Sequence, residues 1–149
     1  MGLDANSTIT VLAVSSSPED LASLRAIFAH SRWRLYQAAS CAEAISLISA
    51  HPIRVVIGVA NLLDGTWRDL LAHGASLRKP PNLIVASHIA DDRLWAEALN
   101  LGAHDVLEMP FRAAEVLRNI SLAWRNWKDA FGELDRADFE ERSCTAVAN

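Results

Sequence analysis

The sequence predicts an α/β domain in which helices cover both faces of a five-stranded parallel sheet. Two observations support this prediction. Apolar runs of strand length alternate five times with segments of helical pattern, which is typical of βαβ units. Runs such as Val55-Val56-Ile57 do not alternate with polar residues, as expected for strands that are covered on both sides. The sheet is therefore expected at the centre of the domain.

Five segments have the length and the apolar composition of strands. They are residues 9–14, 33–38, 53–59, 82–86 and 105–108. Each is followed by a segment that we predict to be helical, and the last of these covers about residues 112–131.

Capping residues indicate where the first two helices begin. Ser17 supplies a hydroxyl, Pro18 stands at the first helical position, and Asp20 follows three residues after the serine. Ser40 and Glu43 repeat the spacing of serine and acid at the second helix.

The third and fourth helices are bounded by similar signals. We expect Asp64 to cap the third helix, which ends near Arg78. Asp91 and Asp92 place negative charge at the start of the fourth helix, where it suits the helix dipole. Gly102 is placed to end that helix.

The chain of 149 residues has the size of one domain. We expect an N-terminal extension at residues 1–8, the domain at 9–131, and an acidic, mobile tail at 132–149.

The net charge is −4 and the basic residues are scattered, so composition gives no sign of a nucleic-acid partner. No apolar run reaches about 18 residues, and the start lacks the features of a signal peptide. We therefore expect a cytoplasmic protein with no membrane contact, in which Cys41 and Cys144 are free thiols.

Three stretches together resemble a known family. An apolar strand leads into a short polar loop and Pro18, an Asp64-Gly65 pair closes the loop after the third strand, and an LGAHDVL segment runs into Met109-Pro110-Phe111. Over about residues 9–130 the sequence resembles a bacterial response-regulator receiver domain of the CheY-like family. The resemblance implies a (βα)5 flavodoxin-like three-layer sandwich with strand order 2-1-3-4-5, and a cis peptide bond before Pro110.

The chain departs from the receiver pattern where the family's chemistry takes place. Receivers hold magnesium with carboxylates, accept the phosphoryl group on an aspartate, and use a switch hydroxyl and a lysine. The residues at the corresponding positions are Ser15, Ser16, Val59, Ala86 and Met109, with Ser87 next to the switch position. We interpret the chain as a degenerate receiver, a pseudo-receiver, that is not an enzyme. A valine and a methionine in place of the aspartate and the lysine avoid leaving one charge unpaired.

Other kinds of site find little support in the sequence. Ser15, Ser16 and Ser17 have no neighbouring base that would activate a hydroxyl. The five histidines show no metal-ligand spacing, so no metal or cofactor is expected. The expected function is therefore two-component-type signalling or regulation through phosphorylation-independent contact with another protein. Two alternatives stay open: a small-molecule sensor that uses the vacated pocket, and a receiver that is still active with unorthodox ligands.

The resemblance implies a contact surface on the fourth helix, the fifth strand and the fifth helix, for a protein partner or a second copy. On the fourth helix, Leu94, Ala98 and Leu101 fall at helical spacing and suffice to cover the sheet. We therefore expect a second set, Trp95, Leu99 and Val106, to form the interface. In the alternative, Trp95 folds back over the edge of the core.

Overall fold

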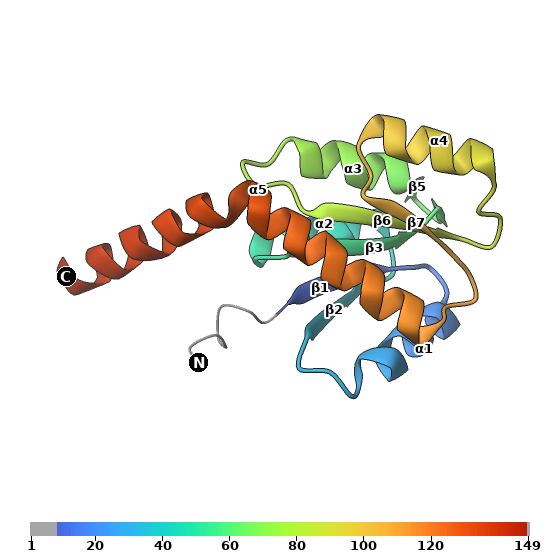
Figure 1. Ribbon diagram of the computed structural model, residues 1–149, viewed down its shortest axis with the longest axis horizontal. Coiled ribbons are helices and arrows are strands. Elements are labelled where there is room, and N and C mark those ends of the chain that lie inside the picture. Colours follow the sequence, from blue (N-terminus) through green and yellow to red (C-terminus); the bar gives the residue numbers. More distant parts are fainter. Residues whose placement is uncertain (1–8, 149) are drawn as a thin grey trace.

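The computed structural model describes the backbone of residues 9–148 and the side chains of residues 9–132 (Figure 1). In chain order the elements are β1 (Thr10–Val14), α1 (Pro18–Phe28), β2 (Arg34–Ala38), α2 (Cys41–Ala50), β3 (Val55–Val59), β4 (Asn61–Leu62), β5 (Gly65–Thr66), α3 (Trp67–Ala75), β6 (Asn82–Ser87), α4 (Asp92–Leu101), β7 (Asp105–Glu108) and α5 (Ala113–Ala148). The predicted N-terminal extension, residues 1–8, lies outside the described residues.

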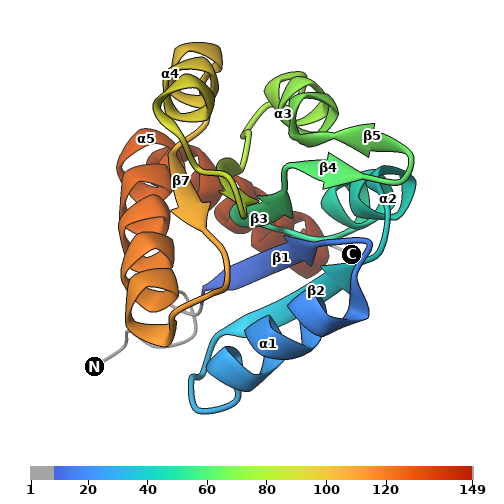
Figure 2. The ribbon, with the colours of Figure 1, turned by 90° about the vertical axis from the view of Figure 1, so that its right-hand side faces the viewer.

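A parallel five-stranded sheet separates two layers of helices. Its strand order is β2-β1-β3-β6-β7, so the predicted (βα)5 sandwich and its 2-1-3-4-5 order are confirmed. One core cluster joins α2, α3 and α4 to the sheet, and the other joins α1 and α5 to the opposite face. Figure 2 looks along the sheet and shows these layers on either side of it.

The central strands are apolar on both faces because both faces are covered. In β1, Leu12 and Val14 pack under α2 and α3, whereas Val11 and Ala13 pack under α1 and α5. All four side chains are buried. This is why the strand shows no polar alternation in the sequence.

The predicted strands agree with the structure to within two residues at each end. The antiparallel hairpin of β4 and β5 was not predicted. Its register pairs Asn61 with Thr66 and Leu62 with Gly65. Strands of two residues are too short to produce a periodic pattern, so the sequence gives no signal for them.

Several predicted helix ends are confirmed. The Ser40 side chain accepts a hydrogen bond from the Glu43 backbone N–H, and Asp91 does the same for Leu94. Gly102 ends α4 with φ of 109°, in the left-handed region that favours glycine.

Two predicted caps are wrong. Ser17 occupies the N-cap position of α1, but its side chain makes no capping bond. Asp64 does not cap α3; Thr66 caps that helix in a capping box with Asp69. Asp64 instead accepts hydrogen bonds from α2, because the hairpin turn carries its carboxylate toward the start of that helix.

The fifth helix is longer than predicted. We expected it to end near residue 131, but α5 continues through Gly132 to Ala148. A glycine inside a helix costs only about 1 kcal/mol relative to alanine, and Ala, Glu, Leu and Arg are common around it. The side chains of residues 133–149, Cys144 among them, lie outside the described ones, so the mobility predicted for 132–149 stays a prediction.

Candidate functional site

The candidate site lies at the edge of the sheet where the carboxyl ends of the central strands meet (Figure 2). We call it the carboxyl edge and define it by the five positions that the sequence analysis selected. Ser15 and Ser16 follow β1, Val59 ends β3, Ala86 lies in β6, and Met109 follows β7. Backbone hydrogen bonds continue the sheet at this edge, from Ala60 N–H to Ala86 C=O at 2.8 Å and from Met109 N–H to Ser87 C=O at 2.9 Å.

Three of the five positions are part of the apolar core. Ala86 and Met109 are buried in the cluster under α1 and α5, and Val59 packs against the same cluster. The peptide bond between Met109 and Pro110 is cis, as the resemblance implied. In this arrangement the side chains of Val59 and Met109 contribute apolar contacts and no charge.

Ser15 is held in a local hydrogen-bond network. Its side chain is buried, and its hydroxyl donates to Asp20 Oδ2 at 2.8 Å and accepts from the Ser17 N–H at 3.1 Å. We predicted Asp20 as a capping residue of α1. Its carboxylate accepts from the Ser15 hydroxyl, which accepts from the Ser17 N–H, so Asp20 is linked to the start of the helix through Ser15. Both groups are used in fixing the first turn of α1.

Ser16 connects three loops. Its hydroxyl donates to the Ala39 C=O at 3.2 Å and accepts from the Leu63 N–H at 3.1 Å. Ser16 follows β1, Ala39 follows β2, and Leu63 is at the β4–β5 turn. One neutral side chain thus ties together loops that are far apart in the sequence.

Asp64 adds a second connection at this edge. Its two carboxylate oxygens accept from the Cys41 N–H at 2.8 Å and the Ala42 N–H at 3.0 Å, the first N–H groups of α2. The hydrogen bond from Cys41 and then the one from Ala42 hold the pKa of Asp64 below its ordinary value. The Asp64 carboxylate therefore caps the start of α2, although it lies in the turn between β4 and β5.

Cys41 lies beside this cap as a buried free thiol. Burial raises the pKa of Cys41, and the negative charges of Asp64 and Asp69 raise it further. The thiolate is the reactive form of cysteine, so this environment disfavours chemistry at the sulfur. Within residues 9–132, no group of three or more His, Cys, Asp or Glu side chains could hold a metal ion.

The predicted interface residues separate into two groups. Trp95 and Leu99 on α4 are 38% and 46% exposed, so the structure places both at the surface. Val106 is only 4% exposed, which makes its prediction as an interface residue wrong. It faces the same core cluster as Ala98, because α4 covers that side of β7.

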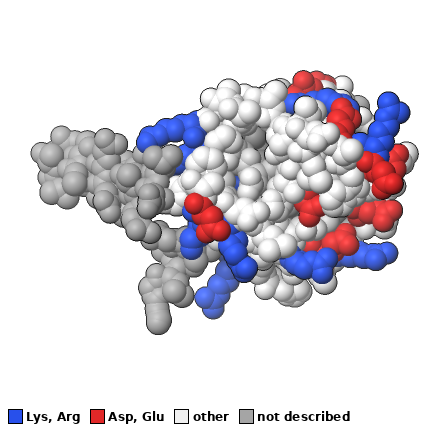
Figure 3. All heavy atoms as spheres, turned by 45° about the horizontal axis from the view of Figure 1, so that its top comes forward, with Lys and Arg blue, Asp and Glu red and all other residues white. Residues whose placement is uncertain are grey.

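Leu101 departs from the prediction in the other direction. We expected it to cover the sheet with Leu94 and Ala98, but Leu101 is exposed. It occupies the last helical position of α4, just before Gly102. Figure 3 shows an area without charged side chains in the middle of one face, with Lys and Arg around it and acidic side chains mainly toward the right-hand end.

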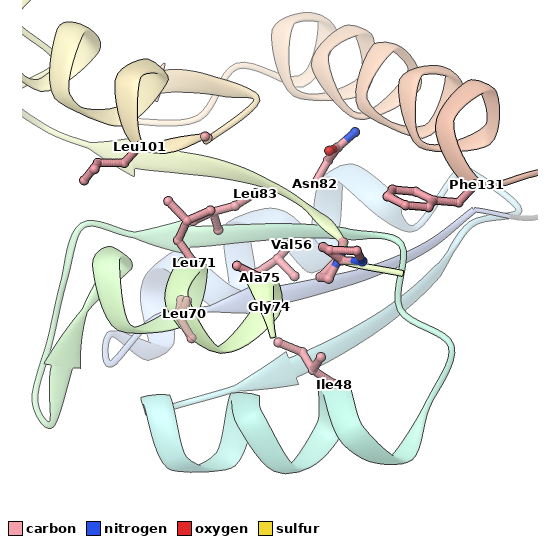
Figure 4. Close-up of a pocket in the computed structure, with 13 residues that line it drawn as sticks. Ile48, Val56, Leu70, Leu71, Gly74, Ala75, Asn82, Leu83, Leu101 and Phe131 are labelled. Atoms are coloured by element: carbon pink, nitrogen blue, oxygen red, sulfur yellow. The ribbon is translucent and has the colours of Figure 1, made fainter. Parts of the chain in front are cut away.

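A cavity that the sequence did not predict lies at the opposite end of the sheet. It has a volume of about 270 Å³ and lies near the amino ends of β3 and β6 (Figure 4). Its walls come from α2, α3, α4 and α5 and from the loop that contains Pro80 and Pro81. A cavity assembled from so many separate segments leaves no local pattern in the sequence.

In the part of the chain that the structure describes, none of the helices combines the length and the apolar composition that a membrane-spanning helix needs.

Comparison with known proteins supports the fold. No family model matches the sequence, and no curated protein matches it. A signal receiver domain from Vibrio parahaemolyticus superposes with a TM-score of 0.76 at 21% identity, over 81% of this chain and 93% of that one. A CheY-like response regulator receiver domain from Methanospirillum hungatei JF-1 has a TM-score of 0.74 at 19% identity, over 83% and 99%.

A third similar structure is the beryllofluoride-activated NtrC4 receiver domain dimer. Its TM-score is 0.73 at 22% identity, and the match covers 79% of this chain and 98% of that one. The chain therefore has the fold of response-regulator receiver domains, with a central parallel sheet of five strands.

Proposed function

We propose that this chain is a pseudo-receiver, which acts in signalling through contact with another protein or a second copy and without accepting a phosphoryl group. The observation that carries the proposal is the composition of the carboxyl edge. Its five positions hold two serines and three apolar residues, Val59, Ala86 and Met109. The apolar three pack with the core cluster under α1 and α5.

The chemistry of phosphoryl transfer supports this reading. A carboxylate acceptor needs a cation such as magnesium, held by oxygen ligands, to offset the charge that develops on the phosphoryl group. The Val59 side chain has no oxygen that could accept a phosphoryl group, and the Met109 side chain has no positive charge that could stabilise one. In the first turn of α1, the Asp20 carboxylate is engaged by the Ser15 hydroxyl.

Treatment with a small phosphodonor tests the first half of the proposal. Intact mass spectrometry after incubation with acetyl phosphate and magnesium is expected to show no added phosphate. A receiver domain that accepts phosphate from this donor, treated in parallel, is the positive control. An acid-labile adduct on a carboxylate of this chain would reject the proposal and favour the alternative of an active receiver with unorthodox ligands.

The exposed residues of α4 support the second half. Trp95 and Leu99 lie one helical turn apart and are both exposed, and tryptophan is enriched among residues that dominate binding energies. One of the similar structures is a dimer of a receiver domain. We infer that this α4 surface, defined as Trp95 and Leu99, contacts the partner, with α5 beside it and Val106 buried beneath it.

Light scattering with matched variants tests this surface. The wild type is expected to be larger than a monomer, and Trp95→Asp is expected to be a folded monomer. Leu63→Asp is the control, because it places the same charge at a fully surface position, 90% exposed, on the hairpin turn instead of α4. If the wild type and both variants run as monomers and Trp95→Asp loses stability, Trp95 belongs to the core and the α4 surface is not an interface.

The alternative of a small-molecule sensor at the vacated pocket has less support. At the carboxyl edge, Ala86 and Met109 are buried in the core and the Ser15 and Ser16 hydroxyls are engaged in hydrogen bonds. The cavity described above lies at the other end of the strands. A ligand site in this protein is therefore better sought there.

A further inference from the structure

The cavity at the amino ends of the strands is a concave space inside the layer of α2, α3 and α4. Val56 and Leu83 form its floor on the sheet, Leu70 comes from α3, Leu101 from the end of α4 and Phe131 from α5. Figure 4 shows these lining residues placed around the pocket on different elements. A site with walls from several elements encloses a small molecule more completely than a flat surface does.

The lining determines which molecules would be accepted. It contains no charged side chain, and its single polar side chain is Asn82. The Asn82 Nδ2 already donates a hydrogen bond to the Ala123 C=O at 2.8 Å. The lining side chains carry no charge that could offset one on a ligand, so burying a charged ligand there is costly, whereas an apolar ligand gains from leaving water.

The volume limits the size of the occupant. An engineered apolar cavity of about 150 Å³ in another protein binds benzene. A cavity of about 270 Å³ has room for a larger, bicyclic molecule. We propose that this cavity is a binding site for a small neutral, apolar molecule of the size of indole or naphthalene.

Such a ligand would contact the end of the helix that carries the α4 surface. Leu101 and Gly102 line the cavity and terminate α4, while Leu99 lies in the same last turn and Trp95 one turn before it. Binding therefore holds α4 against α3 and α5 and restrains the α4 surface. The binding itself does not depend on the proposed function, and only this restraint of the α4 surface rests on it.

Titration with indole as the probe tests the site. Methyl signals of Ile48, Val56 and Leu83 are expected to shift in a saturable manner in NMR spectra of the whole chain. The methyl signals of Ile120, in the core cluster on the other face of the sheet, are expected to stay unchanged. The melting temperature should rise with indole concentration, because a ligand that binds only the folded state stabilises it.

A matched pair of variants on α3 makes the test specific. Ala75 lines the cavity and is exposed, so Ala75→Trp would fill the cavity from its mouth without entering the core. Ala72 is also exposed on α3 but does not line the cavity, so Ala72→Trp adds the same side chain elsewhere. Ala75→Trp is expected to weaken indole binding at least tenfold, and Ala72→Trp to leave it unchanged.

Three results would overturn the proposal. The first is the absence of saturable shifts in the wild type. The second is equal indole binding by Ala75→Trp and the wild type, since the ligand would then be elsewhere. The third is self-association of the wild type that Ala75→Trp abolishes while indole has no effect, because the occupant would then be a side chain of a second copy.

Discussion

The two ends of the sheet differ in how the space between their loops is filled. At the carboxyl edge, hydroxyl and carboxylate side chains join neighbouring loops: Ser16 contacts two of them, and Asp64 caps α2. At the amino ends, apolar walls leave a cavity of about 270 Å³. In receivers the carboxyl ends of the strands carry the chemistry, whereas this cavity lies at the amino ends.

At the carboxyl edge, polar groups of the loops are paired with one another. Loops at the carboxyl ends of parallel strands carry many polar groups, which must be paired if they are to be buried. The pairs at this edge are the Ser15 hydroxyl with the Asp20 carboxylate, the Leu63 N–H with the Ser16 hydroxyl, and the Ala42 N–H with the Asp64 carboxylate. These hydrogen bonds link the loops to one another and to the first turns of α1 and α2.

The largest expected effect comes from placing a charge at the buried Met109 position of the carboxyl edge. Met109 is buried, so Met109→Lys places an ammonium group in the core without a partner and should cost about 3 kcal/mol or more in the free energy of unfolding. Met109→Leu, the control, should cost less than about 1.5 kcal/mol. Denaturant unfolding measures both.

Adding Val59→Asp to that variant asks whether the two positions can form a pair. If they lie close enough, the double variant is expected to recover about 1–3 kcal/mol relative to the sum of the single effects. A Met109→Lys variant as stable as Met109→Leu would show that the ammonium reaches water, and the view of this edge as closed core would be wrong.

Removing the cap that Asp64 provides should have a smaller effect with a distinct pH dependence. Asp64→Ala is expected to lower the melting temperature by several degrees at neutral pH, because two N–H groups of α2 lose their acceptor. The folded-state pKa of Asp64 is lowered, so its stabilisation is complete above the unfolded pKa of about 3.9 and is lost as pH falls toward the folded value.

Melting curves of the wild type and Asp64→Ala from pH 7 down to pH 2 measure this dependence. The two proteins should differ most at neutral pH and converge in acid. A difference that is independent of pH would mean that the charge of Asp64 does not matter, and that the variant acts through the shape of the hairpin turn alone.

Ser16→Ala removes two hydrogen bonds and should cost about 1–2 kcal/mol, since the usual net value of each bond is about 1 kcal/mol. The Leu63 amide, which loses its acceptor, should also exchange its hydrogen faster. Ser17→Ala is the matched control, since the Ser17 side chain makes no capping bond, and it should change stability by less than about 0.5 kcal/mol. Equal losses in both variants would contradict the role of Ser16 as a link between loops.

The smallest effect concerns reactivity rather than stability. Because burial raises the pKa of Cys41, its thiol should react with a disulfide reagent at pH 7 at least about ten times more slowly in the folded chain than in the unfolded chain. A Cys144→Ser background isolates this thiol. Rapid modification of the folded protein would indicate that the carboxyl edge opens readily.

Much of the fold could be predicted because its signals are local. The strands follow from apolar runs, and Ser40, Asp91 and Gly102 mark helix ends through contacts within a few residues. The positions of the carboxyl edge also followed, since strand ends of a parallel sheet meet at one edge. Its internal contacts did not: Ser16 and Leu63 are 47 residues apart.

The sequence by itself therefore determined the layers, the order of elements and which side chains stand at the five positions of the carboxyl edge. The tertiary structure decided which helix Asp64 caps, that α4 covers Val106, and that a cavity remains beside Phe131. The physical reason is the range of the interactions. Propensity and capping act within about one helical turn, whereas these three features depend on how separate segments approach one another in space.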